Sequence, residues 1–408
     1  MNSNIRIVDY SLLIGLFAGG SLSMSYLLPQ VVGYLIAAFM LIFICFYISR
    51  MRNLDVGGLK FTVFTLGGVF LLYMIGMTVS PSLTSSIRFF VFLSTVSICV
   101  LILPAHIDYS VFTDVVSKFT LLLVVLGVPA SLFGTYSIGF VTVDSYASSQ
   151  QIVFTDFWYR PLTSILANPN YMGPLTVLGC LAAIERYSLT ANRYYLLISF
   201  INGIGVYLTN SRNAQLGLAV GLAAIILVKY MKYYILKIGI LFGMGFIVAV
   251  FLAYMGFINA PDVITSISLR GRDVLWKAAL SAVIERPFIG WGPAPTEQIL
   301  SPFIQELSHL THLDLTDRGV HNSYLRMYVT SGILGGTLYI VTFVYLLIIN
   351  SYYENKYIVG QLSSVVVMQI FSTASILGLS LTSLLWVLVL GYSHYSAYEY
   401  QDSSEIST

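Results

Sequence analysis

Charged residues are what this sequence of 408 residues has least of. Only 9% of its residues are Asp, Glu, Lys or Arg, whereas 57% are hydrophobic. Soluble domains carry charge on roughly a quarter of their residues, so the composition excludes an ordinary soluble protein. The net charge of +2 gives no argument for nucleic-acid binding.

Cysteine is also scarce, and Cys45, Cys99 and Cys180 each lie inside an apolar run. They are expected to be small buried residues, with no disulfide framework or metal site. Ionisable residues are missing from the centres of the apolar runs. Ion-coupled transporters usually keep such residues at mid-membrane, so their absence disfavours a transporter.

Long apolar runs are what the sequence has in abundance. A helix needs roughly 20 apolar residues to cross a bilayer, and the alternating pattern of a β-barrel is absent. The pattern predicts an all-α polytopic membrane protein, one integral membrane domain over 1–408, whose N-terminal run is an uncleaved first helix. We expect about twelve spans, at 10–27, 31–49, 60–79, 88–104, 118–136, 171–185, 194–209, 213–228, 238–258, 323–349, 357–376 and 380–395.

The short connections between these runs indicate an orientation. Placing the N-terminus in the cytoplasm satisfies the positive-inside rule, and both termini are then cytoplasmic. The outer side holds two long segments, at 137–170 and 259–322. Its cations are arginines apart from Lys277, and the guanidinium fork matches two phosphate oxygens. Chance, or salt bridges with nearby loop acids, would explain the same bias.

The stretch "LTNSRNAQLG", residues 208–217, forms a polar turn between two apolar runs. Asn210 or Ser211 can cap the returning helix. Arg212 would then lie at a helix N-terminus, where backbone N–H groups favour an anion. Alternatively, Arg212 extends to lipid headgroups at the interface.

The stretch "LRGRDVLWKAALSAVIERPFIGWGPAP", residues 269–295, carries Arg270 and Arg272 at its start. Both arginines could reach a lipid diphosphate. Apolar residues recur at helical spacing after them, which predicts an amphipathic helix on or near the membrane. Trp276 and Trp291 would anchor it at the interface. The "GWGPAP" turn that follows could pass closely over a ligand.

The stretch "DRGVHNSYLRMYVTSG", residues 317–332, places a histidine where an apolar run begins. An imidazole titrates near neutral pH, so His321 could act as a general base. A helix-start histidine that makes one backbone hydrogen bond would look the same. Asn322 and Arg326 lie one turn apart and would face the outer mouth, whereas Asp317 and Arg318 read as solvated loop charges.

A metal site was the competing interpretation of this region. Imidazole and carboxylate groups are zinc ligands, and five of them fall within thirteen residues. Their spacing matches no closed metal site, so we expect no metal. The residues are His309, His312, Asp314, Asp317 and His321.

The three stretches, in this order on one face of a polytopic protein, resemble the signature segments of the O-antigen ligase and polymerase family. They span about 208–340, roughly a third of the chain. The resemblance implies a GT-C-like membrane fold and transfer of a glycan from a polyisoprenyl (undecaprenyl) diphosphate carrier to an acceptor hydroxyl. No cofactor is implied. Asn213 departs from the family, which usually has a glycine there.

Residue by residue, the resemblance assigns Arg212 and Arg272 to diphosphate binding. His321 becomes the base or the residue that orients the acceptor. Arg270, Arg326, Arg160 and Asn322 are further candidates for substrate binding. The implied location is the inner (plasma) membrane, with the active site facing the periplasm or outside.

The acceptor is not encoded in any of these residues. A polymerase adds the chain to another lipid-linked repeat unit of O-antigen, capsular polysaccharide or exopolysaccharide, and we favour this reaction. A ligase would transfer the chain to lipid A-core. The implied partners are the lipid-linked donor, a glycan or lipid A-core acceptor, membrane lipids and a chain-length regulator, without nucleic acid. A lipid-glycan flippase or transporter is the rival from another class.

Overall fold

The structure, a computed structural model, describes residues 3–51, 60–79, 81–139, 141–151, 158–254, 258, 271–307, 315, 319–372 and 374–406. Most of these residues are helical. Among them, six helices are long and apolar enough to cross a membrane by length and composition. They are Val31–Arg50, Lys60–Thr78, Leu83–His106, Tyr109–Phe133, Arg212–Tyr230 and Ser323–Tyr352.

A helix occupies every apolar run that the sequence pattern indicated. The helices before the large loop are α1 (Ser3–Leu22), α2 (Gln30–Met51), α3 (Lys60–Val79), α4 (Leu83–Ser97), the π-helix η1 (Ile98–Ile102), α5 (Leu103–His106), α6 (Tyr109–Phe133), α7 (Pro169–Thr190), α8 (Tyr194–Leu208), α9 (Arg212–Tyr230) and α10 (Tyr233–Tyr254). The helices within and after the large loop are α12 (Arg272–Glu285), α13 (Thr296–Glu306), α14 (Ser323–Tyr352), α15 (Lys356–Gln369) and α16 (Leu381–Ile406). The sequence analysis did not predict α13.

Two small antiparallel hairpins follow α6, and they too were not predicted. β1 (Tyr136–Ile138) pairs with β2 (Val141–Val143), and β3 (Gln150–Gln151) pairs with β4 (Trp158–Tyr159). Strands this short carry no periodicity that a sequence pattern can reveal.

Helix α6 begins at Tyr109 rather than near residue 118, because the buried carboxylate of Asp114 has partners that stabilise its charge. Lys118 Nζ lies 2.8 Å from the Asp114 carboxylate, which is buried. Tyr10 of α1 and Tyr195 of α8 each donate a hydrogen bond of 2.5 Å to the same carboxylate. This buried network joins α1, α6 and α8.

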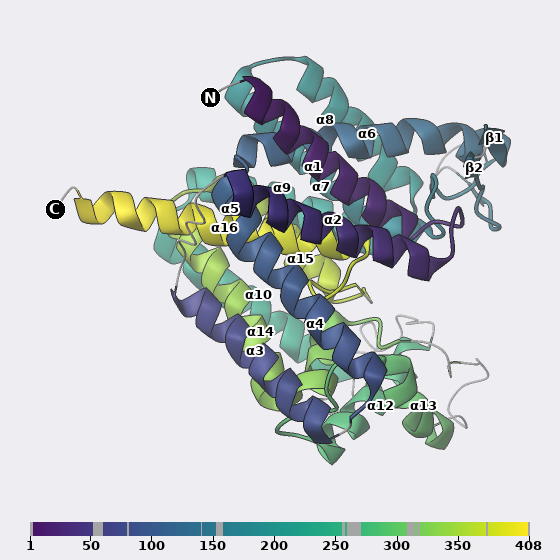
Figure 1. The fold of residues 1–408 in the computed structure, drawn as a ribbon, viewed down its shortest axis with the longest axis vertical. Coiled ribbons are helices and arrows are strands. Elements are labelled where there is room, and N and C mark those ends of the chain that lie inside the picture. The colour runs from purple at the N-terminus through teal and green to yellow at the C-terminus, as the bar shows by residue number, and fades with distance from the viewer. Residues whose placement is uncertain are drawn as a thin grey trace.

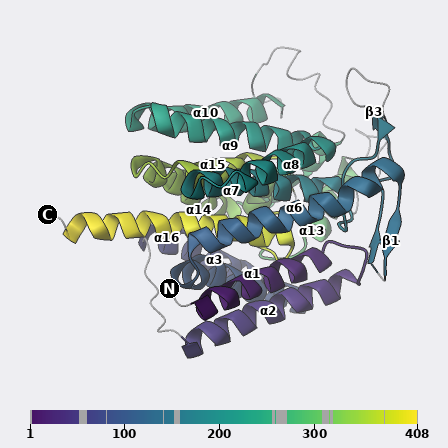
Figure 2. The same cartoon turned by 90° about the horizontal axis from the view of Figure 1, so that it is seen from above.

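The long connections and the chain ends lie at opposite ends of the bundle. The two termini lie toward one end, whereas β1 and β2, and at a distance from them α12 and α13, lie toward the other (Figure 1). Figure 2 shows the C-terminus and β1 on opposite sides. We refer to the end with β1, α12 and α13 as the loop end. The three stretches with candidate residues all reach this end, so the fold brings them to the same side of the molecule.

Candidate functional site

The polar turn that precedes α9 holds Arg212 at the first position of the helix. Ser211 is the N-cap, and its hydroxyl accepts from the N–H of Ala214 at 3.5 Å. This confirms one of the two caps that the sequence allowed. The Arg212 side chain is exposed, as anion binding at a helix start requires.

Asn213 connects this turn to the end of α15. Its side-chain N–H donates to the carbonyl oxygen of Met368 at 2.8 Å. The residue that departs from the family's usual glycine therefore fixes the start of α9 against another helix. Arg212 is adjacent to this contact.

Arg272 begins α12, directly after Gly271, whose φ of 84° is left-handed. The guanidinium carbon lies 5.9 Å from the ring centroid of Phe371. One turn along the same helix, the Trp276 ring lies 6.4 Å from that same ring. Phe371, in the segment after α15, thus contacts two residues on one face of α12.

The sequence analysis expected Trp276 to anchor the helix at a membrane interface, and the structure corrects this expectation. Its side chain is buried, because the apolar face of α12 packs against α13 and the start of α14. The indole N–H donates to the Val320 carbonyl at 3.0 Å. Trp276 therefore positions the backbone immediately before His321.

His321 lies in the left-handed region, with φ of 50°, and its side chain is half-buried. The helix cap is the next residue, because Asn322 accepts from the N–H of Leu325 at 3.0 Å. The turn that results holds His321 outside α14 rather than in its first turn. Left-handed backbone at a non-glycine residue costs energy and is often found at functional sites.

The start of α14 also binds the segment that follows α15. The Ser323 hydroxyl donates to the carbonyl oxygens of Ser372, at 3.1 Å, and Ala374. The Tyr324 hydroxyl donates to Val366 at 2.8 Å. We call residues 366–372 and 374 the α15 end.

All three candidate stretches therefore meet around the α15 end. The turn at Arg212 reaches it through Asn213, the stretch at Arg272 through Phe371, and the stretch at His321 through Ser323. No sequence pattern marks this segment, because it contacts the stretches through backbone carbonyls and an apolar ring. Only the chain's long-range packing reveals it.

The "GWGPAP" turn approaches a helix rather than an open ligand surface. Gly332 interrupts α14 with φ of 69° and ψ of −175°. The freed carbonyls of Val329 and Thr330 accept from the N–H groups of Trp291, at 3.0 Å, and Gly292, at 2.8 Å. These two hydrogen bonds hold the large loop at the break in α14, which fixes α12 relative to α14.

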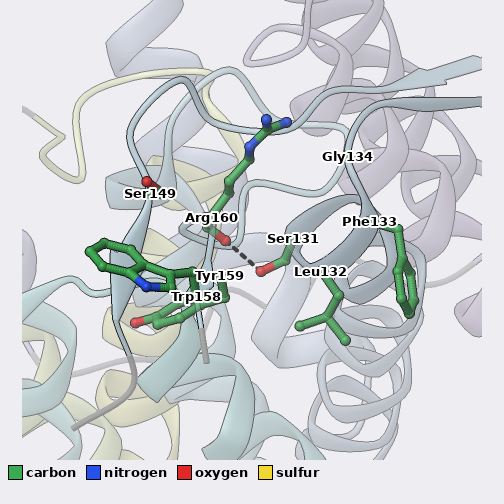
Figure 3. Close-up of a pocket in the computed structure, with 8 residues that line it drawn as sticks. All are labelled: Ser131, Leu132, Phe133, Gly134, Ser149, Trp158, Tyr159 and Arg160. Carbon is green, nitrogen blue, oxygen red and sulfur yellow. Dashed lines mark hydrogen bonds between the residues drawn. The ribbon is translucent and has the colours of Figure 1, made fainter. Parts of the chain in front are cut away.

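Arg160 lines a pocket of about 260 Å³ beside the end of α6. Its guanidinium donates to Ser145 at 2.6 Å and points away from the Ser131 hydroxyl, which donates to the Arg160 carbonyl (Figure 3). The N–H of Leu162 donates to the carbonyl oxygen of Leu208 at 2.9 Å, which places the segment after β4 near the turn at Arg212. Trp158, also in the pocket, is exposed.

Arg326 lies further along α14 and is half-buried, one turn before Thr330, whose hydroxyl is 2.9 Å from that of Tyr73 on α3. Arg270 falls outside the described residues. So do Asp317, Arg318 and three of the other candidate metal ligands, His309, His312 and Asp314.

These features define the class of protein: a polytopic α-helical membrane protein whose arginine-bearing loop segments lie toward one end. Residues 197–340 match the O-antigen ligase family. The matched region contains all three candidate stretches, in agreement with the resemblance seen in the sequence. Comparison with curated proteins yields no match.

Proposed function

We propose that the protein is a glycosyltransferase. It moves an oligosaccharide or polysaccharide from a polyisoprenyl diphosphate carrier to the hydroxyl of an acceptor sugar, at the outer face of the inner membrane. The observation that supports this most is the meeting of the stretches with Arg212, Arg272 and His321 around the α15 end. These stretches carry two cations and an imidazole, the groups that the proposed reaction would use.

In the proposed step, the acceptor oxygen attacks the anomeric carbon of the donor sugar. The bond from that carbon to the diphosphate oxygen breaks, and the polyisoprenyl diphosphate leaves with the electron pair. The hydroxyl proton passes to the His321 imidazole, which later releases it to solvent. Balanced in this way, the step leaves the charge of the diphosphate to be stabilised.

Arg212 and Arg272 would stabilise that charge. A charge-assisted hydrogen bond contributes about 1.5–3 kcal/mol. Removing a donor aimed at developing charge costs on the order of 100-fold in rate. If both arginines stabilise the leaving diphosphate, the proposed reaction needs no paired carboxylate.

Purified protein with a polyisoprenyl diphosphate-linked glycan tests this proposal. We expect a longer glycan and free polyisoprenyl diphosphate to form in equal amounts. Free carrier without a longer glycan would indicate a hydrolase. If neither product forms, the proposed transfer is rejected.

Polymerisation of repeat units is the reaction that we favour, with ligation to lipid A-core as the alternative. Deleting the gene in its host separates them. A single repeat unit left on the acceptor indicates a polymerase. Polymerised lipid-linked chains that accumulate, with bare acceptor at the surface, indicate a ligase.

A further inference from the structure

The pocket between the end of α6 and β4 combines an exposed aromatic ring with hydrogen-bonding groups. Its volume is about 260 Å³. Pockets for small ligands begin at roughly 300 Å³, so this pocket suits a group of the size of one sugar ring better than a longer chain. Figure 3 shows the residues that line it, among them Ser131 and Leu132 of α6 and Trp158 of β4.

Hydrogen bonds hold the two walls of the pocket together. The N–H of Arg160 donates to the carbonyl oxygen of Ser131 at 2.9 Å, and the Ser131 hydroxyl donates to the carbonyl oxygen of Arg160. Further along the chain, the Thr163 hydroxyl donates to the carbonyl oxygen of Asp144 at 2.9 Å. The walls are therefore in place before a ligand binds, as is usual for small-ligand sites.

The two exposed side chains of this wall differ in chemistry. Tyr159 is buried, whereas Trp158 and Arg160 on either side of it are exposed, as alternation along an extended strand predicts. The Arg160 guanidinium donates to Ser145 at 2.6 Å. A guanidinium carries five N–H donors, and this bond uses one of them. Arg160 can therefore also donate to a ligand in the pocket.

Trp158 presents a large apolar ring at the surface, because its side chain is 58% exposed. A tryptophan at the outer end of a membrane protein often anchors it at the interface. An anchor needs no polar wall, however, whereas this indole shares its pocket with Arg160, Ser131 and Ser149. A sugar ring fits both kinds of group, since its C–H face stacks on an aromatic ring while its hydroxyls bond to guanidinium and serine groups.

The pocket is tied to the turn that carries Arg212. Leu162, two residues after Arg160, bonds the carbonyl oxygen of Leu208 at 2.9 Å. Leu208 ends α8, four residues before Arg212. An extended chain spans at most about 3.6 Å per residue, which limits the path between Arg160 and Arg212 to roughly 30 Å. A glycan whose diphosphate lies at Arg212 can therefore place one of its sugars in the pocket.

We propose that this pocket is a sugar-binding subsite, in which Trp158 stacks on one sugar ring and Arg160 donates hydrogen bonds to its hydroxyls. The ring lies in the glycan away from the reacting bond, an assignment that rests on the proposed function. It belongs either to the donor chain or to the acceptor chain. Contacts at this distance from the reacting bond select the glycan and do not take part in transfer.

Binding of a carrier-free glycan tests the subsite without requiring transfer. The probe is the repeat unit released by mild acid from the host's own lipid-linked glycan, titrated calorimetrically into purified protein in detergent. The variants are Trp158→Ala and Arg160→Gln. The matched controls are Tyr230→Ala, an exposed aromatic residue at the far end of α9, and Arg193→Gln, an exposed arginine directly before α8.

The unmodified protein and both controls should bind the probe with equal affinity. Each pocket variant should bind it about tenfold more weakly or worse, because a stacked ring or a hydrogen bond from a charged donor is lost. Unfolding temperatures should stay unchanged, since both side chains are exposed. Unchanged affinity in Trp158→Ala would make Trp158 a membrane anchor and overturn the subsite. Absence of binding by the unmodified protein would overturn it as well.

Transfer kinetics identify the chain that supplies the sugar. In Trp158→Ala, a higher KM for the donor alone assigns the donor chain, and a higher KM for the acceptor alone assigns the acceptor chain. Unchanged KM values for both would overturn the subsite. A protein that binds the probe through Trp158 and Arg160 but transfers nothing would reject the proposed function and keep the sugar site, so the two failures are distinguishable.

Discussion

The indole N–H of Trp276 donates a hydrogen bond of 3.0 Å to the carbonyl oxygen of Val320, the residue that precedes His321. One turn before Trp276, on the same face of α12, Arg272 lies over the ring of Phe371. A single helix thus holds a candidate phosphate ligand and fixes the backbone beside the candidate base. The relative positions of Arg272 and His321 depend on this contact.

Trp276→Phe should lower the rate of transfer by about tenfold or more, because a misplaced catalytic group is costly even at small displacements. The phenyl ring keeps most of the packing but cannot donate to Val320. We expect kcat to fall with little change in KM and a small decrease in thermal stability. Trp386 is buried in α16, and its indole N–H has no hydrogen-bond partner among the described residues, so the control Trp386→Phe should leave kcat unchanged. A loss of stability without a change in kcat would limit Trp276 to packing.

Gly332→Ala should destabilise the docking of the large loop on α14. An added Cβ would lie 2.3 Å from the Phe288 carbonyl oxygen. The left-handed backbone also costs alanine about 1–3 kcal/mol. In the α3 helix, a Cβ on Gly67 would meet nothing within 4 Å, so Gly67→Ala is the matched control. Proteolysis of the loop should speed up in the first variant alone, and equal rates would argue against the loop being held by the break.

Asp114→Ala should lower the thermal stability of the bundle. The change leaves the buried Tyr195 hydroxyl without its acceptor, which costs about 1–3 kcal/mol. Lys118→Ala removes the other member of the ion pair, whose side chain is 46% exposed. An exposed partner contributes little, so this variant should unfold near the temperature of the unmodified protein. A larger effect for Lys118→Ala would show that the ion pair, and not the tyrosine bonds, holds α1, α6 and α8.

The helices themselves could be predicted from sequence, because an apolar run inside a membrane must satisfy its backbone hydrogen bonds within the segment. The helix at Arg272–Glu285 was also predictable, since its apolar residues repeat at helical spacing, and these residues are the ones buried. The elements that cover these residues could not be predicted. The helical pattern fits a membrane surface and a protein surface equally well, and only the structure shows α13 and α14 against them.

Two features of the candidate site had no signal in the sequence. Phe371 lies in an apolar stretch, and no sequence pattern distinguishes its aromatic ring from the others in the chain. The break at Gly332 depends on a distant turn that supplies the missing hydrogen bonds.

The rate of transfer from a polyisoprenyl diphosphate-linked glycan, measured in a single turnover, tests the central claim most directly. The variants are Arg212→Lys, Arg272→Ala and His321→Asn; asparagine tolerates the left-handed backbone at His321. Arg193→Ala is the control. The proposed site predicts rates about 100-fold lower or worse for all three variants, with normal folding and a normal rate for the control. Rates within twofold of the unmodified protein in folded Arg272→Ala or His321→Asn would contradict it.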